Sequence, residues 1–275
     1  MRAEINVLGT LEVAFNDVCV VPTARKTRQL LAILAINAGS VVHTSTIMEE
    51  LWGTRMPRSA AGTLQTYVLH VRRLIRRALP ADQADASHEI LATSHTGYTL
   101  RVEPESVDAV RYARLSAMGR TAGRAGDHAR ADQLLDAALA LWRGPVLVDV
   151  NIGPQLEIET MSLAESRLTD IALRIDAGLV LGRHHQLLGE LAALCARHPY
   201  IEHFHAQHML ALYRSGRPGQ ALEAYQGLST TMHEQFGVDP SPRLRQLHHA
   251  LLVGDEQLDD PRFMVNDPTP DAIAG

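Results

Sequence analysis

The hydrophobic pattern of the chain is clearest between residues 57 and 79, where PRSAAGTLQTYVLHVRRLIRRAL sorts into two faces at helical spacing. This spacing predicts an amphipathic helix. Its apolar face comprises Leu64, Tyr67, Val68, Val71, Leu74, Ile75 and Ala78. Its opposite face is centred on Thr66, His70, Arg73 and Arg77 and is flanked by Gln65, Leu69, Arg72 and Arg76. The polar face therefore carries four arginines and no acidic residue.

The charge of this polar face separates two interpretations of the helix. A helix that only faces solvent usually mixes Glu with Lys or Arg at i,i+4 spacing, and this helix does not. A face of cations, amides and hydroxyls suits the phosphate-lined groove of a nucleic acid. Taken alone, the pattern also fits a surface helix of an arginine-rich protein. The neighbouring elements are therefore needed to choose between these two interpretations.

The patterns on either side of this helix predict an N-terminal α+β domain. We expect strands in residues 5–13 and 19–21, with a turn at Asn16–Asp17, and helices in residues 23–37 and 44–52. After the basic helix, residues 89–93 and 98–102 predict a β-hairpin around the turn Ser94–Gly97. This order is typical of a winged helix-turn-helix domain. In that domain the third helix enters the major groove, and the hairpin reaches the adjacent minor groove or backbone.

From residue 108 onward the pattern predicts almost only helices. Gly182 and Gly216 lie 34 residues apart, and Pro199 follows Gly182 by 17 residues, as in tetratricopeptide repeats. Because Pro104 precedes the change of pattern, we expect one domain in residues 1–103 and a helical-repeat domain in residues 104–253. Residues 254–275 are acidic and contain proline, which predicts a largely disordered tail. The expected fold class is mainly α with a small β component.

The net charge of −5 would argue against a nucleic-acid partner if it were evenly distributed. Residues 1–103, however, hold 11 basic and 9 acidic residues, and the remaining chain holds 15 basic and 22 acidic residues. Because salt screens charges beyond about 10 Å, the local excess of cations matters for binding more than the total charge. The asymmetry therefore places any nucleic-acid contact in the first domain.

Cysteine content and hydropathy bear on the location of the protein. Cys19 and Cys195 lie far apart in sequence, which is typical of a reducing cytosol, and we expect both as small buried residues. No apolar run approaches the roughly 18 residues that a membrane span needs. We therefore expect a cytoplasmic, nucleoid-associated protein without membrane contact.

The sequence offers no basis for catalysis or metal binding. It lacks the glycine-rich phosphate motifs, the GxSxG elbow and the HExxH metal motif. Among its 14 histidines, His205 and His208 share a helix face, but the sequence shows no complete ligand set near them. We therefore expect a protein that is not an enzyme and binds neither a metal nor a cofactor.

Two motifs in the first domain resemble a known family. LQTYVLHVRRL followed by TGYTLRV resembles the winged-helix domain of OmpR-type regulators, and its N-terminal position without a receiver domain resembles the Streptomyces antibiotic regulatory protein (SARP) family. The resemblance implies groove contacts by Gln65, Thr66, His70 and Arg73, with Arg72 toward the DNA backbone. It also implies contacts of the wing through Ser94, Thr96 and Tyr98. Here His95-Thr96 replaces the Gly- or Pro-bearing turn that is common in the family.

The helical wheel adds its own assignments beside this resemblance. Arg73 lies near the centre of the outward face and is the first candidate for a bidentate contact with guanine. Arg76 and Arg77 follow one turn later and are expected on phosphates. Leu69 is an aliphatic residue on the same face, where it either contacts a thymine methyl group or packs against the hairpin. The cations of residues 25–28 either touch phosphates or form a solvated helix end.

Two further segments resemble the bacterial transcriptional activation domain of the same family. These segments are ALALWRGPVLVD at residues 138–149 and FGVDPSPRLR at residues 236–245, so the likeness extends from about residue 5 to about residue 252. We expect Trp142 as a core anchor, and Ser241 with Pro242 as a helix start. The resemblance implies activation, self-association as a dimer on DNA, binding to promoter direct repeats and RNA polymerase holoenzyme as partner.

Two function classes remain after these exclusions. The first is a sequence-specific transcriptional activator, which the resemblance assigns to an antibiotic or secondary-metabolite gene cluster. The second is a helical-repeat adaptor whose winged-helix domain contacts protein. An adaptor has no need of four arginines on one helix face without an acid, so the first hypothesis is favoured.

Overall fold

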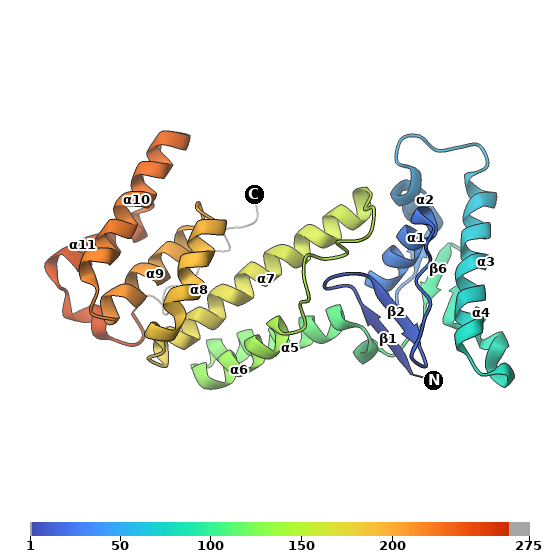
Figure 1. Cartoon of the computed structure of the whole chain (residues 1–275), viewed down its shortest axis with the longest axis horizontal. Coiled ribbons are helices and arrows are strands. Elements are labelled where there is room, and N and C mark those ends of the chain that lie inside the picture. Colours follow the sequence, from blue (N-terminus) through green and yellow to red (C-terminus); the bar gives the residue numbers. More distant parts are fainter. Residues whose placement is uncertain (1, 264–275) are drawn as a thin grey trace. The chain divides into compact units, whose positions relative to one another are not determined.

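The computed structural model describes residues 2–263, of which most are helical (Figure 1). The chain divides into two compact units, one of residues 1–117 with 136–169 and one of residues 118–135 with 170–275. Small antiparallel sheets occur near the N-terminus, and helices make up the rest. This confirms the expected fold class of a winged helix-turn-helix followed by an all-helical domain.

The first unit begins with a three-stranded antiparallel sheet in the order β1-β2-β3. Its strands are β1 Ala3–Asn6, β2 Glu12–Phe15 and β3 Val18–Cys19. Asn16 and Asp17 connect β2 to β3 with φ values of 49° and 65°. Asn and Asp tolerate this left-handed conformation better than other side chains do, so the turn predicted at these two residues is confirmed.

Three helices and a second antiparallel sheet form the winged helix-turn-helix. The helices are α1 Arg25–Ile36, α2 Thr44–Trp52 and α3 Ala60–Ala78. The sheet has the order β4-β6-β5, with β4 Val42–His43, β5 Leu91–Thr93 and β6 Gly97–Leu100. Between α3 and β5 the chain forms a short 3-10 turn, η1 Ala81–Ala86, and the helix α4 Ser87–Ile90.

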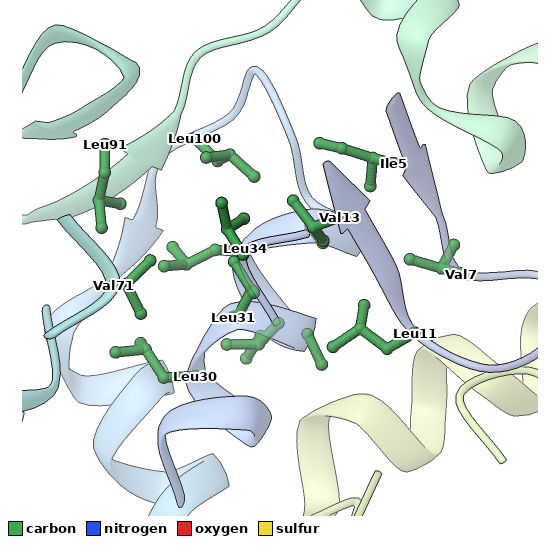
Figure 2. Packing of buried hydrophobic residues seen from close by; sticks show 14 of the residues in the cluster. Ile5, Val7, Leu11, Val13, Leu30, Leu31, Leu34, Val71, Leu91 and Leu100 are labelled. Carbon is green, nitrogen blue, oxygen red and sulfur yellow. The ribbon is translucent and has the colours of Figure 1, made fainter. Parts of the chain in front are cut away.

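The core of the first unit is built around the apolar face of α1 (Figure 2). Leu31 and Leu34 of α1 lie between Val13 of β2 on one side and Val71 of α3 on the other. All four side chains are fully buried. Burying such a side chain contributes about 1.5–3 kcal/mol relative to an exposed position, so this contact holds α3 and the first sheet against α1.

The remaining helices are distributed over the two units. They are α5 Asp108–Arg124, α6 His128–Leu139, α7 Pro154–Val180, α8 His184–Arg197, α9 Glu202–Arg214, α10 Pro218–Phe236 and α11 Pro242–Val253. The first turns of α5, the last residues of α6 and the first half of α7 belong to the first unit. The packing therefore does not follow the sequence boundary expected at Pro104.

The buried carboxylate of Glu50 is one reason for this packing. Glu50 lies in α2 and is only 2% exposed. Its two oxygens accept hydrogen bonds from the backbone N–H groups of Gly153 at 2.6 Å and of Gln155 and Leu156 at 3.0 Å each. Gln29 of α1 donates to the same side chain at 2.7 Å. A negative charge at the unpaired N–H groups of a helix start is favourable, so Glu50 joins α7 to the helix-turn-helix.

The buried carboxylate of Asp108 makes a second connection of the same kind. It accepts hydrogen bonds at 2.9 Å from the backbone N–H groups of Val7 and Leu8. Burial raises the pKa of Asp108 above its ordinary value, while these N–H groups and the charge of Arg143 lower it. Asp108 thus ties the start of α5 to the loop between β1 and β2.

The segment that resembles the activation-domain signature packs on this same loop. The backbone N–H of Arg143 donates to the carbonyl of Leu8 at 2.8 Å. Asp149 accepts from the N–H of Leu11 at 2.8 Å and pairs with Arg28 at 3.0 Å. Trp142 packs edge-on against the buried ring of Tyr112, with 5.4 Å between the ring centroids, and so anchors the core as expected. The signature residues therefore serve the packing of the first unit.

The second unit consists of helices that pack in sequence, α8 on α9, α9 on α10 and α10 on α11. Gly182 and Gly216 precede α8 and α10 with φ values of 75° and 72°, which only glycine adopts without strain. The hydroxyl of Ser241 accepts from the N–H of Leu244, and Pro242 is the first residue of α11. The predicted cap and start of α11 are therefore confirmed.

Residues 254–263 are ordered, unlike the disordered tail that the sequence indicated from residue 254. Residues Glu256–Asp259 form a 3-10 turn, η3, whose Leu258 is fully buried. The guanidinium of Arg214 donates to the carbonyl oxygens of Leu258, at 2.9 Å, and of Asp260. The burial of Leu258 and the hydrogen bonds of Arg214 thus hold this segment in place despite its acidic composition. Residues 264–275 of the expected tail lie outside the described residues.

The cysteines differ from expectation in one respect. Cys195 is partly buried, and burial raises the pKa of its thiol to about 11, so the thiol stays protonated at neutral pH. Cys19 lies at the end of the edge strand β3, both of whose residues are exposed. Across residues 2–263 no helix is long and apolar enough to cross a membrane.

We predict that Glu50→Ala lowers the free energy of unfolding by roughly 2–4 kcal/mol, because it leaves buried N–H groups at the start of α7 without a partner. The matched control is Glu49→Ala, since Glu49 is exposed and makes one hydrogen bond to Gln155 at 3.1 Å. The control should change stability by no more than about 0.5 kcal/mol. Chemical denaturation measures both values, and equal small losses would contradict the connecting role of Glu50.

Candidate nucleic-acid interface

The outward face of α3 is fixed by the residues buried on its other side. Leu64, Val68, Val71 and Ile75 are at most 2% exposed and pack in the core. Seven residues of the predicted polar face are exposed, namely Gln65, Thr66, Leu69, His70, Arg73, Arg76 and Arg77. The structure thus brings together on one side of α3 all the predicted contact residues of this helix except Arg72.

Arg72 is used inside the protein. Its guanidinium donates to the carbonyl oxygen of Leu91 at 3.0 and 2.7 Å and to the hydroxyl of Thr93 at 2.7 Å. Burial lowers the pKa of Arg72, and the nearby Tyr98 raises it. Hydrogen bonds from a cationic donor are the strong ones, so Arg72 ties α3 to strand β5. This structural contact sets the wing against α3 and competes with the contact of Arg72 with the DNA backbone, which stays a prediction.

The wing is the hairpin of β5 and β6, and its turn is closed by two hydrogen bonds. The N–H of Ser94 donates to the carbonyl of Gly97 at 2.9 Å, and the N–H of Gly97 donates to the Ser94 hydroxyl at 3.1 Å. Ser94 is half-buried by this turn, whereas Thr96 and His95 are exposed at the tip. Tyr98 is half-buried beside β4, where it pairs with Val42. Of the three predicted wing residues, Thr96 is therefore the most accessible.

Gly97 is required by the close approach of β4. A Cβ atom at this position would lie 2.0 Å from the carbonyl oxygen of Val42 and 2.9 Å from the Cα of His43. The N–H of Thr44, at the start of α2, donates to the carbonyl of Thr96 at 3.0 Å. Glycine thus lets the wing lie directly against the start of the helix-turn-helix.

Leu69 is 43% exposed and lies on the outward face between Thr66 and Arg73. Of the two alternatives left open for Leu69, packing against the hairpin does not agree with this exposure. This exposure favours the other alternative, an apolar contact with a thymine methyl group, which stays a prediction.

Of the three cations at the start of α1, Lys26 and Arg28 are engaged within the fold, whereas Arg25 is exposed. Lys26 donates to the carbonyl of Leu51 and, at 3.2 Å, to the side chain of Gln29. Arg28 donates to the carbonyl of Pro22 at 3.0 Å and pairs with Asp149. Neither the expected phosphate contact nor a solvated helix end describes these two residues. Lys26 instead serves the C-terminal end of α2, where carbonyl groups attract a cation.

Two exposed arginines escaped the sequence reasoning. Arg55 and Arg58 lie in the loop between α2 and α3, immediately before α3 begins. Residues 51–81 contain six arginines and no acidic residue. This composition could have drawn attention to the loop, because the start of a helix also attracts phosphate through its free N–H groups.

The three histidines of α9, His203, His205 and His208, are half-buried in the second unit. His203 contacts Asp176 at 3.2 Å and Gln207 at 3.1 Å, and His205 contacts the carbonyl of Pro199 at 3.1 Å. Burial lowers the pKa values of His205 and His208, which favours their neutral forms. Among residues 2–263 no group of three or more His, Cys, Asp or Glu side chains is arranged to hold a metal ion.

Comparison with protein-family models finds two matches that together cover most of the chain. Residues 20–100 match "Transcriptional regulatory protein, C terminal", and residues 107–252 match "Bacterial transcriptional activator domain". The first match includes α3 and the wing, and the second includes α5 to α11.

Known proteins resemble the chain over nearly its full length. The regulatory protein DnrI of Streptomyces peucetius is 46% identical, over 93% of this chain and 94% of DnrI. The transcriptional regulator RedD of Streptomyces coelicolor is 34% identical, over 96% of this chain and 75% of RedD. The solved structure of Mycobacterium tuberculosis EmbR in complex with a low affinity phosphopeptide is 30% identical, with a TM-score of 0.86, and the match covers 96% of this chain and 69% of that chain.

Both the family models and these relatives agree with the exposed cationic face of α3 and with the wing beside it. The chain belongs to the Streptomyces antibiotic regulatory protein family and is a non-enzymatic, DNA-binding transcriptional regulator with an OmpR-type winged helix-turn-helix and a bacterial transcriptional activator domain.

Proposed function

We propose that the protein activates transcription of an antibiotic or secondary-metabolite gene cluster by binding direct repeats in its promoters. The observation that carries this proposal is the outward face of α3, which has three exposed arginines and no acid and is held rigidly by a fully buried opposite face. Such a helix fits the major groove, where side chains meet both base edges and phosphates.

The contacts divide according to position along α3. Gln65, Thr66, His70 and Arg73 read base edges, together with the exposed methyl groups of Leu69. Arg76 and Arg77, at the end of the helix, bind phosphates. Thr96 at the tip of the wing contacts the neighbouring backbone, and Ser94 and Tyr98 support it from the turn and from β6. Arg72 acts through β5 and does not touch DNA.

Two copies of the chain bind one site, because a single winged domain reads too few base pairs for a genome. Direct repeats about one helical turn apart place the two copies head to tail on one side of the duplex. RNA polymerase holoenzyme is the partner that these bound copies recruit.

The alternative function is a helical-repeat adaptor whose winged-helix domain binds protein. The helices α8 to α11 support an adaptor role in general, because stacked helix pairs present surfaces for proteins. The six arginines without an acid in residues 51–81 favour DNA as the ligand of the winged-helix domain.

A salt titration on promoter fragments next to the gene for this protein tests the proposal. We expect protection of direct repeats in footprinting and an affinity that falls with salt by a logarithmic slope of about −0.9 for each phosphate contact. An affinity that does not change with salt would leave the adaptor as the better function.

Arg73→Ala and Arg77→Ala should separate base contacts from phosphate contacts. Arg73→Ala should cost about 1–3 kcal/mol on the cognate repeat and reduce discrimination against altered repeats. Arg77→Ala should weaken cognate and random DNA by similar factors and reduce the salt slope by about one. Binding isotherms on both DNAs measure this, and equal losses for Arg73→Ala on both would remove its base contact.

Arg72→Ala should lower the free energy of unfolding by roughly 1–3 kcal/mol, because the carbonyl of Leu91 loses a charged donor. Arg76→Ala, an exposed arginine on the same helix, is the control and should change stability by no more than about 0.5 kcal/mol. Denaturant titration gives both values. If Arg72→Ala instead kept full stability and reduced the affinity for all DNA, Arg72 would be a phosphate contact after all.

A further inference from the structure

The first half of α7, residues 154–169, carries an exposed face that neither the fold nor the DNA contact uses. Ile158 and Met161 are each 63% exposed, although both are large apolar side chains. At helical spacing they share one stripe with Ser162 and Glu165, which are exposed too. The buried side of this helix is opposite, at Leu156. We call the stripe with its flanking acids, Glu157, Ile158, Glu159, Met161, Ser162 and Glu165, the α7 face.

All the charged residues of the α7 face are glutamates. In the part of the chain that the structure describes, the carboxylates of Glu157, Glu159 and Glu165 form no ion pair. The one arginine of these turns, Arg167, lies over the ring of Trp142, 4.7 Å from its centroid, on the side away from Ile158. Three glutamates around two exposed apolar side chains repel the phosphates of DNA. They also repel the same face of a second copy of the chain.

The α7 face belongs to the same compact unit as α3. Glu50 binds the N–H groups of residues 153, 155 and 156, directly before the face begins. Within this unit, Figure 1 shows the start of α7 beside α2, with α3 on the far side of the helix-turn-helix. The face is therefore part of the same unit as α3 and separate from the outward face of α3 that the proposed function assigns to DNA.

We propose that the α7 face is an activating surface that docks on a basic, partly apolar surface of RNA polymerase holoenzyme. This rests on the proposed function, in which the bound protein recruits the polymerase. Proteins that bind DNA carry clusters of basic residues, which complement the acidic rim formed by the three glutamates. Methionine and isoleucine at the centre supply the apolar contact, since buried apolar anchors ringed by polar residues dominate binding energy in protein interfaces.

The decisive variant is Ile158→Ser combined with Met161→Ser. Its matched control is Leu252→Ser combined with Val253→Ser in α11, where the two side chains are 58% and 62% exposed. Footprinting on the promoter repeats measures DNA occupancy, and transcription from the same promoter by purified RNA polymerase holoenzyme measures activation. Loss of two apolar anchors should reduce activated transcription by about tenfold or more at full promoter occupancy, because each 1.4 kcal/mol of binding is tenfold. The control should retain activation.

Each outcome bears on the proposal. Reduced activation with unchanged occupancy supports it, and unchanged activation overturns it. Reduced occupancy of the double variant also overturns it, because the face would then serve DNA binding. Failure of the unaltered chain to occupy any promoter would defeat the proposed function first, and the inference with it. Should thermal unfolding show that the serine variant is destabilised, Glu165→Lys provides the same test by inverting a charge at an exposed position of the stripe.

Discussion

The buried carboxylate of Glu50 is the interaction on which the arrangement of the DNA-binding unit depends. A charge with 2% exposure is costly unless every oxygen is hydrogen-bonded, and here the backbone N–H groups of a helix start supply the bonds. Those N–H groups belong to α7, far along the chain, while Glu50 belongs to the helix-turn-helix. The carboxylate therefore supplies acceptors for the N–H groups at the start of α7, and these groups supply donors for the buried carboxylate. Asp108 repeats this arrangement at the loop between β1 and β2.

The consequence is that the DNA-binding unit is larger than the winged-helix motif. The segment around Trp142 and Asp149, which resembles an activation-domain signature, packs on the β1–β2 loop and on α1. A regulator built in this way carries part of its activator domain in contact with α1 and α2 of the helix-turn-helix.

In the recognition helix α3, packing gives chemically identical arginine side chains different surroundings. Four arginines occur within six positions of α3, yet they differ in what their guanidinium groups can reach. Arg72 points to strand β5 and binds its carbonyl, whereas Arg73, one residue later, is exposed on the outward face. The difference of about 100° between consecutive helix residues decides which guanidinium is engaged within the fold and which is exposed.

The sequence by itself determined the order of the three helices and the wing hairpin, the apolar face of α3 and the turn at Asn16–Asp17, because periodicity and turn chemistry are local. It also indicated which side of α3 faces outward. Only the tertiary structure decided that Arg72, Lys26 and Arg28 bind groups within the protein. It also decided that the N–H groups at the start of α7 donate to the carboxylate of Glu50. These outcomes depend on hydrogen bonds between residues far apart in the chain, and no local pattern of hydrophobic and polar positions records which carbonyl or N–H group a charged side chain will meet.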